Sequence, residues 1–165
     1  MRRLVIILAV FAAFLPLFAQ SETSQIEYTT EQQDSIKNSS IAEEHVINGA
    51  LFEMKEQYAE AILEYQDALR LNPLSGVYYA LSKCYYRLGK LGPALENSQK
   101  AAELEGNNTE YLTLLGTIYT SAQQIDSAAA VFNKIIAIDS LNVGAYYSLG
   151  NIYEVENPLQ ALDIY

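Results

Sequence analysis

A single alanine recurs along the chain at a nearly constant interval. Its four copies are 33, 34 and 33 positions apart: Ala61, Ala94, Ala128 and Ala161. A period of about 20 to 50 residues is typical of stacked structural units, because each unit has to bury its apolar face against a neighbour. With 165 residues, half of them apolar, the chain is long enough to form such a stack as one domain.

Three other positions keep the same period. A large aromatic residue precedes each alanine by eight or nine positions: Phe52, Tyr85, Tyr119 and Tyr153. A small residue lies three positions before each aromatic: Gly49, Ser82, Gly116 and Gly150. The position four after each alanine is large except once: Tyr65, Ser98, Phe132 and Tyr165. Small and large residues alternating at helical spacing predict pairs of closely packed helices, and Pro73 is expected to end the first unit.

This pattern resembles the tetratricopeptide repeat, whose period is 34 residues. The most similar stretch is YYSLGNIY at 146–153, where tyrosine stands in place of the family's tryptophan. The resemblance implies an all-α fold, a right-handed solenoid of antiparallel helix pairs with about three and a half repeats in 42–165. The repeats are expected at 42–74, 75–108 and 109–142, with a partial unit at 143–165.

The first 41 residues differ from the array. Arg2 and Arg3 precede an uncharged stretch from Leu4 to Ala19, which predicts a secretory signal peptide at 1–19. A permanent membrane anchor is the alternative, disfavoured because the stretch is shorter than the roughly 20 residues that span a bilayer. No cysteine lies near the cut, so a lipid anchor is not expected. We therefore expect a bacterial-type exported chain, periplasmic or secreted, with no membrane span after cleavage. Residues 20–41, rich in Ser, Thr, Gln and Glu, are expected to form a disordered linker.

The sequence contains few of the residues that catalysis or cofactor binding requires. The chain has one histidine, one cysteine and no glycine-rich phosphate loop, so we expect neither an enzyme nor a bound cofactor or metal. His45 has no second His or Cys one turn away and is interpreted as a solvated helix-end residue. Cys84 lies at an apolar helical position and is predicted to be a core thiol. The net charge of −10, without a basic cluster, disfavours nucleic acid as a partner.

The family resemblance also implies a binding surface. In the family, fixed positions of the first helix of each unit face a concave groove. Those positions supply the candidate peptide-binding residues: Tyr79, Lys83, Tyr86, Arg87, Thr113, Thr117, Tyr147 and Asn151, with Thr120 and Glu154 on the same face. Tyrosine offers rigid contact area, Asn can pair with peptide backbone, and Lys or Arg can meet a carboxylate. Packing between units is the alternative role for the tyrosines. Val46 and Ala50 replace the polar residues of the family's carboxylate clamp, which is therefore not expected.

These features favour an exported scaffold that binds a peptide or protein segment in the groove. The alternative is the N-terminal extracytoplasmic sensing region of a longer membrane receptor or signalling protein. It is motivated by the last helix, beginning near Leu159, whose apolar face has no polar cap. The same helix leaves self-association open as a further interaction.

Overall fold

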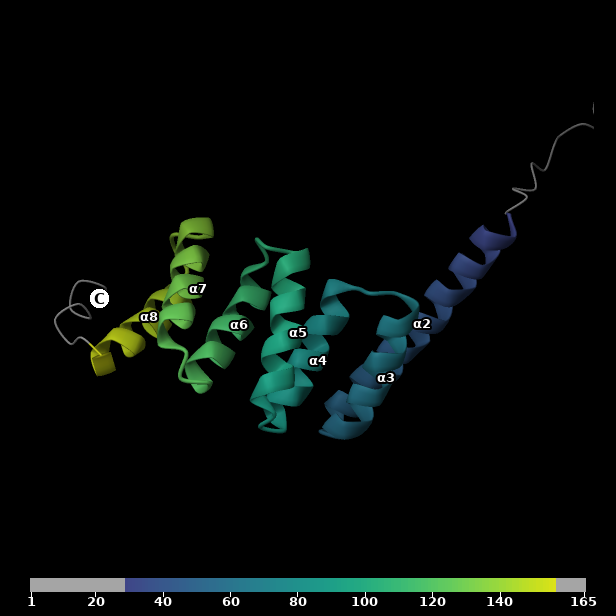
Figure 1. Cartoon of the computed structure of the whole chain (residues 1–165), viewed down its shortest axis with the longest axis horizontal. Helices are drawn as coiled ribbons and strands as arrows, with labels where there is room; N and C mark the ends of the chain where they lie inside the picture. Colours follow the sequence, from purple (N-terminus) through teal and green to yellow (C-terminus); the bar gives the residue numbers. More distant parts are fainter. Residues whose placement is uncertain (1–28, 157–165) are drawn as a thin grey trace, which may run out of the picture. The chain divides into compact units, whose positions relative to one another are not determined.

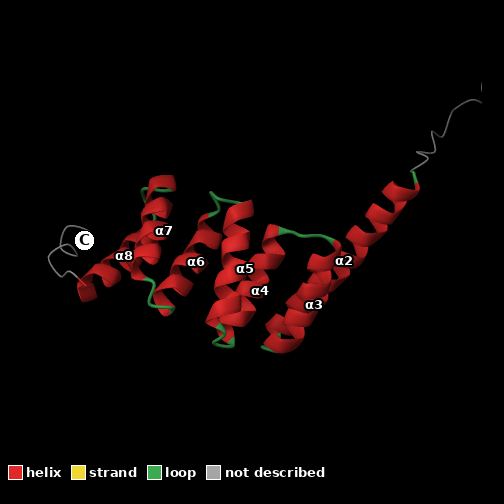
Figure 2. Ribbon diagram, viewed as in Figure 1, coloured by secondary structure: helices red, strands yellow, loops and turns green. Residues whose placement is uncertain are grey.

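The computed structural model describes residues 29–156, and every regular element in that range is an α-helix (Figures 1 and 2). The helices are α2 (Thr30–Met54), α3 (Tyr58–Leu71), α4 (Ser75–Arg87), α5 (Leu91–Leu104), α6 (Thr109–Ser121), α7 (Ile125–Ile138) and α8 (Val143–Glu156). The chain divides between Ser35 and Ile36 into two compact units, and the repeats lie in the second. The fold is an α-helical repeat solenoid, which confirms the predicted fold class. Within 29–156 no helix is long and apolar enough to cross a bilayer. The signal peptide and the helix expected near Leu159 lie outside the described residues.

The segment expected to be a linker at 20–41 is helical from Thr30 onward. A capping box at its start explains the difference. The backbone N–H of Gln32 donates to Thr29 Oγ1 at 3.3 Å, and the backbone N–H of Thr29 donates to Gln32 Oε1 at 2.9 Å. Once its first turn has formed, a helix propagates at small cost through polar residues such as Glu, Gln and Lys. The low hydrophobicity of this segment therefore wrongly predicted that residues 30–41 are disordered.

The turns inside the three complete helix pairs share one geometry. Each contains a residue with positive φ: Glu56 (59°), Gly89 (71°) and Gln123 (58°). In each, an N–H donates to the carbonyl five residues earlier at 2.9 Å: Gln57 to Phe52, Lys90 to Tyr85 and Gln124 to Tyr119. This hydrogen bond is the one that closes a helix in a Schellman motif. Only the α4–α5 turn uses glycine, the residue that adopts positive φ at least cost.

Two of the predicted glycine contacts are present between the helices of a pair. A Cβ atom on Gly49 would lie 2.6 Å from the Tyr65 ring, and one on Gly116 would lie 2.8 Å from the Phe132 ring. The aromatic side chain therefore packs directly on the helix backbone, and there is no room for even a methyl group. Tyr165, the large residue four positions after the last recurring alanine, lies outside the described residues.

In the α4–α5 pair, two serines occupy the positions that hold glycine and an aromatic residue in the other two pairs. Ser82 takes the glycine position and Ser98 takes the aromatic position, and both are almost fully buried. Ser82 Oγ donates to the carbonyl of Ala94 at 2.8 Å, whereas the buried Ser98 Oγ has no hydrogen-bond partner. A larger residue on one helix is thus matched by a smaller one on the other. The two departures from the sequence pattern compensate each other.

The recurring alanines and the cysteine lie in the core. Ala61, Ala94 and Ala128 are all 0% exposed, as expected for the points where helices touch. Cys84 is also 0% exposed, which confirms the predicted core thiol. Burial, followed by the nearby Glu53 carboxylate, raises the pKa of Cys84 to about 12. At neutral pH the thiol is therefore protonated and out of reach of solvent.

Candidate functional site

The predicted groove residues lie on the first helices of successive pairs. Tyr79, Lys83, Tyr86 and Arg87 lie on α4, Thr113 and Thr117 on α6, and Tyr147 and Asn151 on α8. Their exposure differs. The Tyr147 side chain is 62% exposed, Arg87 and Thr113 are exposed, and the others on α4 are half-buried. The half-buried residues contact neighbouring helices, and their contacts are described one residue at a time below.

Tyr79 joins α4 to α6. Its ring stacks on that of Tyr111, with centroids 4.9 Å apart, and its hydroxyl donates to Glu110 Oε1 at 2.8 Å. Burial and the hydrogen bond to Glu110 raise the pKa of Tyr79. Packing between repeats, the alternative role for this tyrosine, is therefore present. Any ligand at this position would contact a ring that is already held on one side.

Lys83 is paired within the chain. Its ammonium lies 2.6 Å from Glu53 Oε1 of α2 and 5.5 Å from the centroid of the Tyr79 ring. The other carboxylate oxygen of Glu53 accepts a 3.0 Å hydrogen bond from the Tyr65 hydroxyl, and burial followed by the charge of Glu53 raises the pKa of Tyr65. A carboxylate ligand would have to compete with Glu53 for Lys83. Glu53 was not among the predicted groove residues, although it occupies the position in the first unit that corresponds to Tyr86.

Tyr86 forms a second link between α4 and α6. Its hydroxyl lies 3.0 Å from Ser121 Oγ. Ser121 Oγ already donates its only proton to the Thr117 carbonyl at 3.0 Å, so the Tyr86 hydroxyl is the donor in this contact. Arg87, the last residue of α4, is exposed beside it.

A pocket of about 320 Å³ lies between α6, α7 and α8. Its lining residues are Thr117, Thr120, Ser121, Ile125, Phe132, Ser148, Asn151 and Ile152. The first helices α6 and α8 supply the walls, and the second helix α7 supplies Ile125 and Phe132 behind them. The structure thus brings together Thr117, Thr120 and Asn151 of the predicted surface, while Thr113 and Tyr147 do not line the pocket. Ser148 and Ile152 were missed, because only the fold shows that α8 closes the space.

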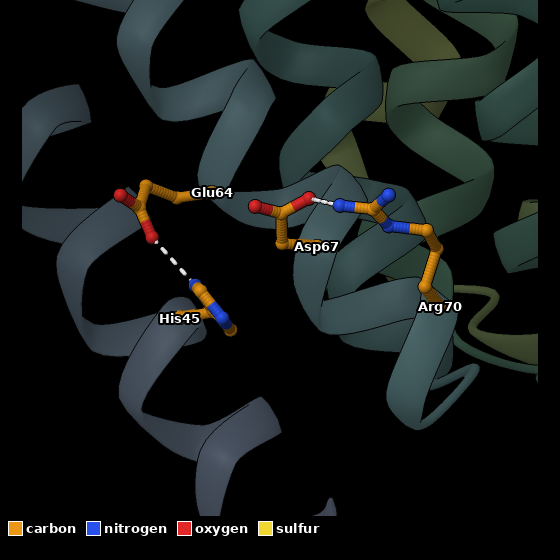
Figure 3. A network of polar contacts seen from close by, with 4 residues as sticks. All are labelled: His45, Glu64, Asp67 and Arg70. Carbon is orange, nitrogen blue, oxygen red and sulfur yellow. Dashed lines mark hydrogen bonds and ion pairs between the residues drawn. The ribbon is translucent and has the colours of Figure 1, made fainter.

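A polar network on the first helix pair involves the only histidine (Figure 3). His45 Nδ1 of α2 lies 2.7 Å from Glu64 Oε2 of α3, and both side chains are about a quarter exposed. The interpretation of His45 as a solvated helix-end residue is therefore wrong. Helix α2 begins at Thr30, well before His45, and Glu64 faces it. Asp67 and Arg70 form a second ion pair one turn further along α3. Among residues 29–156, no group of three or more His, Cys, Asp or Glu could hold a metal ion.

Comparison with protein families agrees with this architecture. The tetratricopeptide repeat model matches residues 75–108 and 109–140, which contain the pairs α4–α5 and α6–α7. These two units match the tetratricopeptide repeat model, and residues 29–156 form an α-helical repeat solenoid.

Curated relatives share the repeats at low identity. The chain is 27% identical over 123 residues to Hsp70-Hsp90 organizing protein 3 of Arabidopsis thaliana, a match that covers 74% of this chain and 22% of the relative. It is 28% identical over 106 residues to BBSome complex member BBS4 of Bos taurus, covering 64% and 20%. The chain thus spans about a fifth of the length of these relatives.

Solved structures share the fold. YrrB, a TPR protein with an unusual peptide-binding site, superposes with a TM-score of 0.70 at 29% identity, covering 76% of this chain and 66% of YrrB. The first TPR of Spaghetti (RPAP3), bound to the HSP90 peptide SRMEEVD, superposes with a TM-score of 0.67 at 20% identity, covering 71% and 94%. MamA superposes with a TM-score of 0.71 at 22% identity, covering 74% and 73%.

Proposed function

We propose that this chain is a protein–protein interaction scaffold that binds a peptide or protein segment along α4, α6 and α8. The observation that carries the proposal is the pocket between α6 and α8, which two residues chosen from the sequence, Thr117 and Asn151, line together. Its walls combine hydroxyl and amide groups with the apolar Ile125, Phe132 and Ile152. A pocket with an apolar interior and a few polar groups is typical of ligand sites.

The neighbouring surface extends the site in both directions along the first helices. The exposed Tyr147 ring offers rigid contact area beside the pocket, and Arg87 offers a charge near the end of α4. The solved structures of YrrB and of the first TPR of Spaghetti also point to peptides as ligands of this fold. A surface built this way suits an extended or helical segment more than a compact metabolite.

Peptide selection tests the groove directly. A random displayed peptide library is selected on the 165-residue chain, on Thr117→Trp and on Asn133→Trp. Thr117→Trp fills the pocket, whereas Asn133→Trp places the same ring on an exposed position of α7. We expect enrichment on the wild-type chain and on Asn133→Trp, and a loss of at least about tenfold on Thr117→Trp, equivalent to about 1.4 kcal/mol of binding free energy. Equal enrichment on all three proteins, or on none, would show that this groove is not the binding site.

We also propose that the scaffold is exported. The support is the sequence of residues 1–19, with Arg2 and Arg3 before an uncharged apolar stretch that ends at Ala19. When the chain is expressed in a bacterium and the mature protein is sequenced from its N-terminus, we expect it to begin within a residue or two of Gln20. A mature protein that retains Met1 and remains in the cytoplasm would contradict export.

A further inference from the structure

We infer that the pocket between α6 and α8 selects a ligand that supplies hydrogen-bond donors, namely a basic segment whose lysine or arginine side chain enters it. The inference rests on the proposed function and specifies the partner's chemistry. From the sequence, Lys83 and Arg87 were predicted to meet a ligand carboxylate. The hydrogen bonds of α6 favour the opposite polarity for the wall of the pocket that α6 supplies.

The hydroxyl groups along α6 already act as hydrogen-bond donors within their own helix. Each bonds to the carbonyl one turn earlier: Thr113 to Thr109 at 2.6 Å, Thr117 to Thr113 at 2.8 Å, Thr120 to Gly116 at 2.9 Å and Ser121 to Thr117 at 3.0 Å. A carbonyl has no proton to give, so the hydroxyl must be the donor in all four contacts. What remains on each oxygen for a ligand is acceptor capacity. Helix α6 therefore presents lone pairs to the pocket.

The donors on α4 are engaged in the same way. The Tyr79 hydroxyl donates to Glu110, and the Tyr86 hydroxyl donates to Ser121. The ammonium of Lys83 is held 2.6 Å from a Glu53 oxygen. An incoming carboxylate would have to displace each of these donors from the acceptor that it already contacts.

Charge favours the same ligand. The chain has a formal net charge of −10, and Glu53 and Glu110 lie among the groove contacts just described. Arg87 opposes this trend at the end of α4, and, like Glu53 and Glu110, it does not line the pocket. A cationic segment is therefore attracted over a distance of about one Debye length, roughly 8 Å at physiological ionic strength.

The interior of the pocket matches the shape of a long basic side chain. Phe132, Ile125 and Ile152 supply apolar surface that the methylene stem of lysine or arginine can cover. The hydroxyl oxygens of Thr117 and Thr120 then meet the N–H groups of the charged end. A cation bound to neutral oxygens forms hydrogen bonds stronger than those between neutral groups.

Two measurements test this inference. In the selection described above, the enriched peptides are expected to carry more Lys and Arg, and fewer Asp and Glu, than the starting library. The best peptide is then synthesised and its affinity measured for the wild-type chain, for Thr117→Val with Thr120→Val, and for Thr30→Val, which lies exposed at the start of α2 and outside the proposed binding surface. Valine keeps the shape and net charge but removes the acceptor oxygens. We expect the double variant to lose about tenfold or more in affinity and Thr30→Val to bind as the wild type does.

Results that contradict this inference can be distinguished from results that contradict the proposed function. Enrichment of acidic peptides over basic ones would overturn the inference and leave the scaffold proposal standing. Unchanged affinity of the double valine variant would also overturn it, because the attraction would then come from bulk charge and not from the pocket. If no peptide is enriched over Thr117→Trp, the proposed function fails as well.

Discussion

Gly116→Leu is expected to lower the free energy of unfolding by about 3 kcal/mol, the upper end of the usual cost of overpacking a core. The reason is the contact between α6 and α7, where even a Cβ atom would lie 2.8 Å from the Phe132 ring. The ring is 2% exposed and is enclosed by other core side chains, so it has no free space into which to move. Urea unfolding of the two proteins, followed by far-UV circular dichroism, measures the difference.

Gly92→Ala is the matched control for this substitution. Gly92 also lies in a helix, α5, but a Cβ atom there meets nothing within 4 Å. Alanine favours the helix by up to about 1 kcal/mol over glycine, so Gly92→Ala should be neutral or stabilising. If Gly116→Leu and Gly92→Ala shift the unfolding midpoint equally, the close contact between Gly116 and Phe132 does not limit the packing.

Ser98→Phe is expected to destabilise the chain by about 2 kcal/mol, whereas Ser82→Gly with Ser98→Phe is expected to be at least as stable as the wild type. The double variant gives the α4–α5 pair the glycine and aromatic combination of the two neighbouring pairs. It buries an aromatic ring and removes the Ser98 hydroxyl that has no hydrogen-bond partner. In the single variant the new ring meets the Ser82 side chain, whereas the corresponding rings of the neighbouring pairs, Tyr65 and Phe132, each meet a glycine.

A double-mutant cycle isolates the coupling between these two positions. Unfolding of the wild type, both single variants and the double variant should give a favourable interaction energy of at least about 3 kcal/mol. The control is Ser82→Gly alone, which removes the hydrogen bond to Ala94 and should cost about 1 kcal/mol. Additive effects of the two substitutions would mean that positions 82 and 98 do not share one packing site.

Much of the fold could be predicted from the period of small and large residues. The interval of 33 or 34 residues predicted helix pairs, and the contacts Gly49–Tyr65 and Gly116–Phe132 follow from the positions picked out in the sequence. Periodicity is sufficient here because a contact between the helices of a pair is repeated in every unit. The helical start of α2 was missed, since the composition of residues 30–41 masked the capping box at Thr29 and Gln32.

The candidate site could be predicted only in part from the sequence. The family pattern identified which side chains of α4, α6 and α8 share a face, and it included Thr117 and Asn151. It did not show that Lys83 is paired with Glu53, because that ion pair joins residues thirty positions apart whose separation depends on how two repeats stack.

Sequence periodicity thus determined the helix pairs of the repeats, the positions of the small and aromatic residues that pack between them and that Cys84 is buried. The tertiary structure decided which polar groups of this surface are already paired across helices. Hydrogen bonding depends on atoms a few ångströms apart, and only the packed helices show that the Tyr79 and Tyr86 hydroxyls donate to Glu110 and Ser121 of α6. A residue's chemical type states what it can donate or accept, whereas its neighbours determine what is left for a partner.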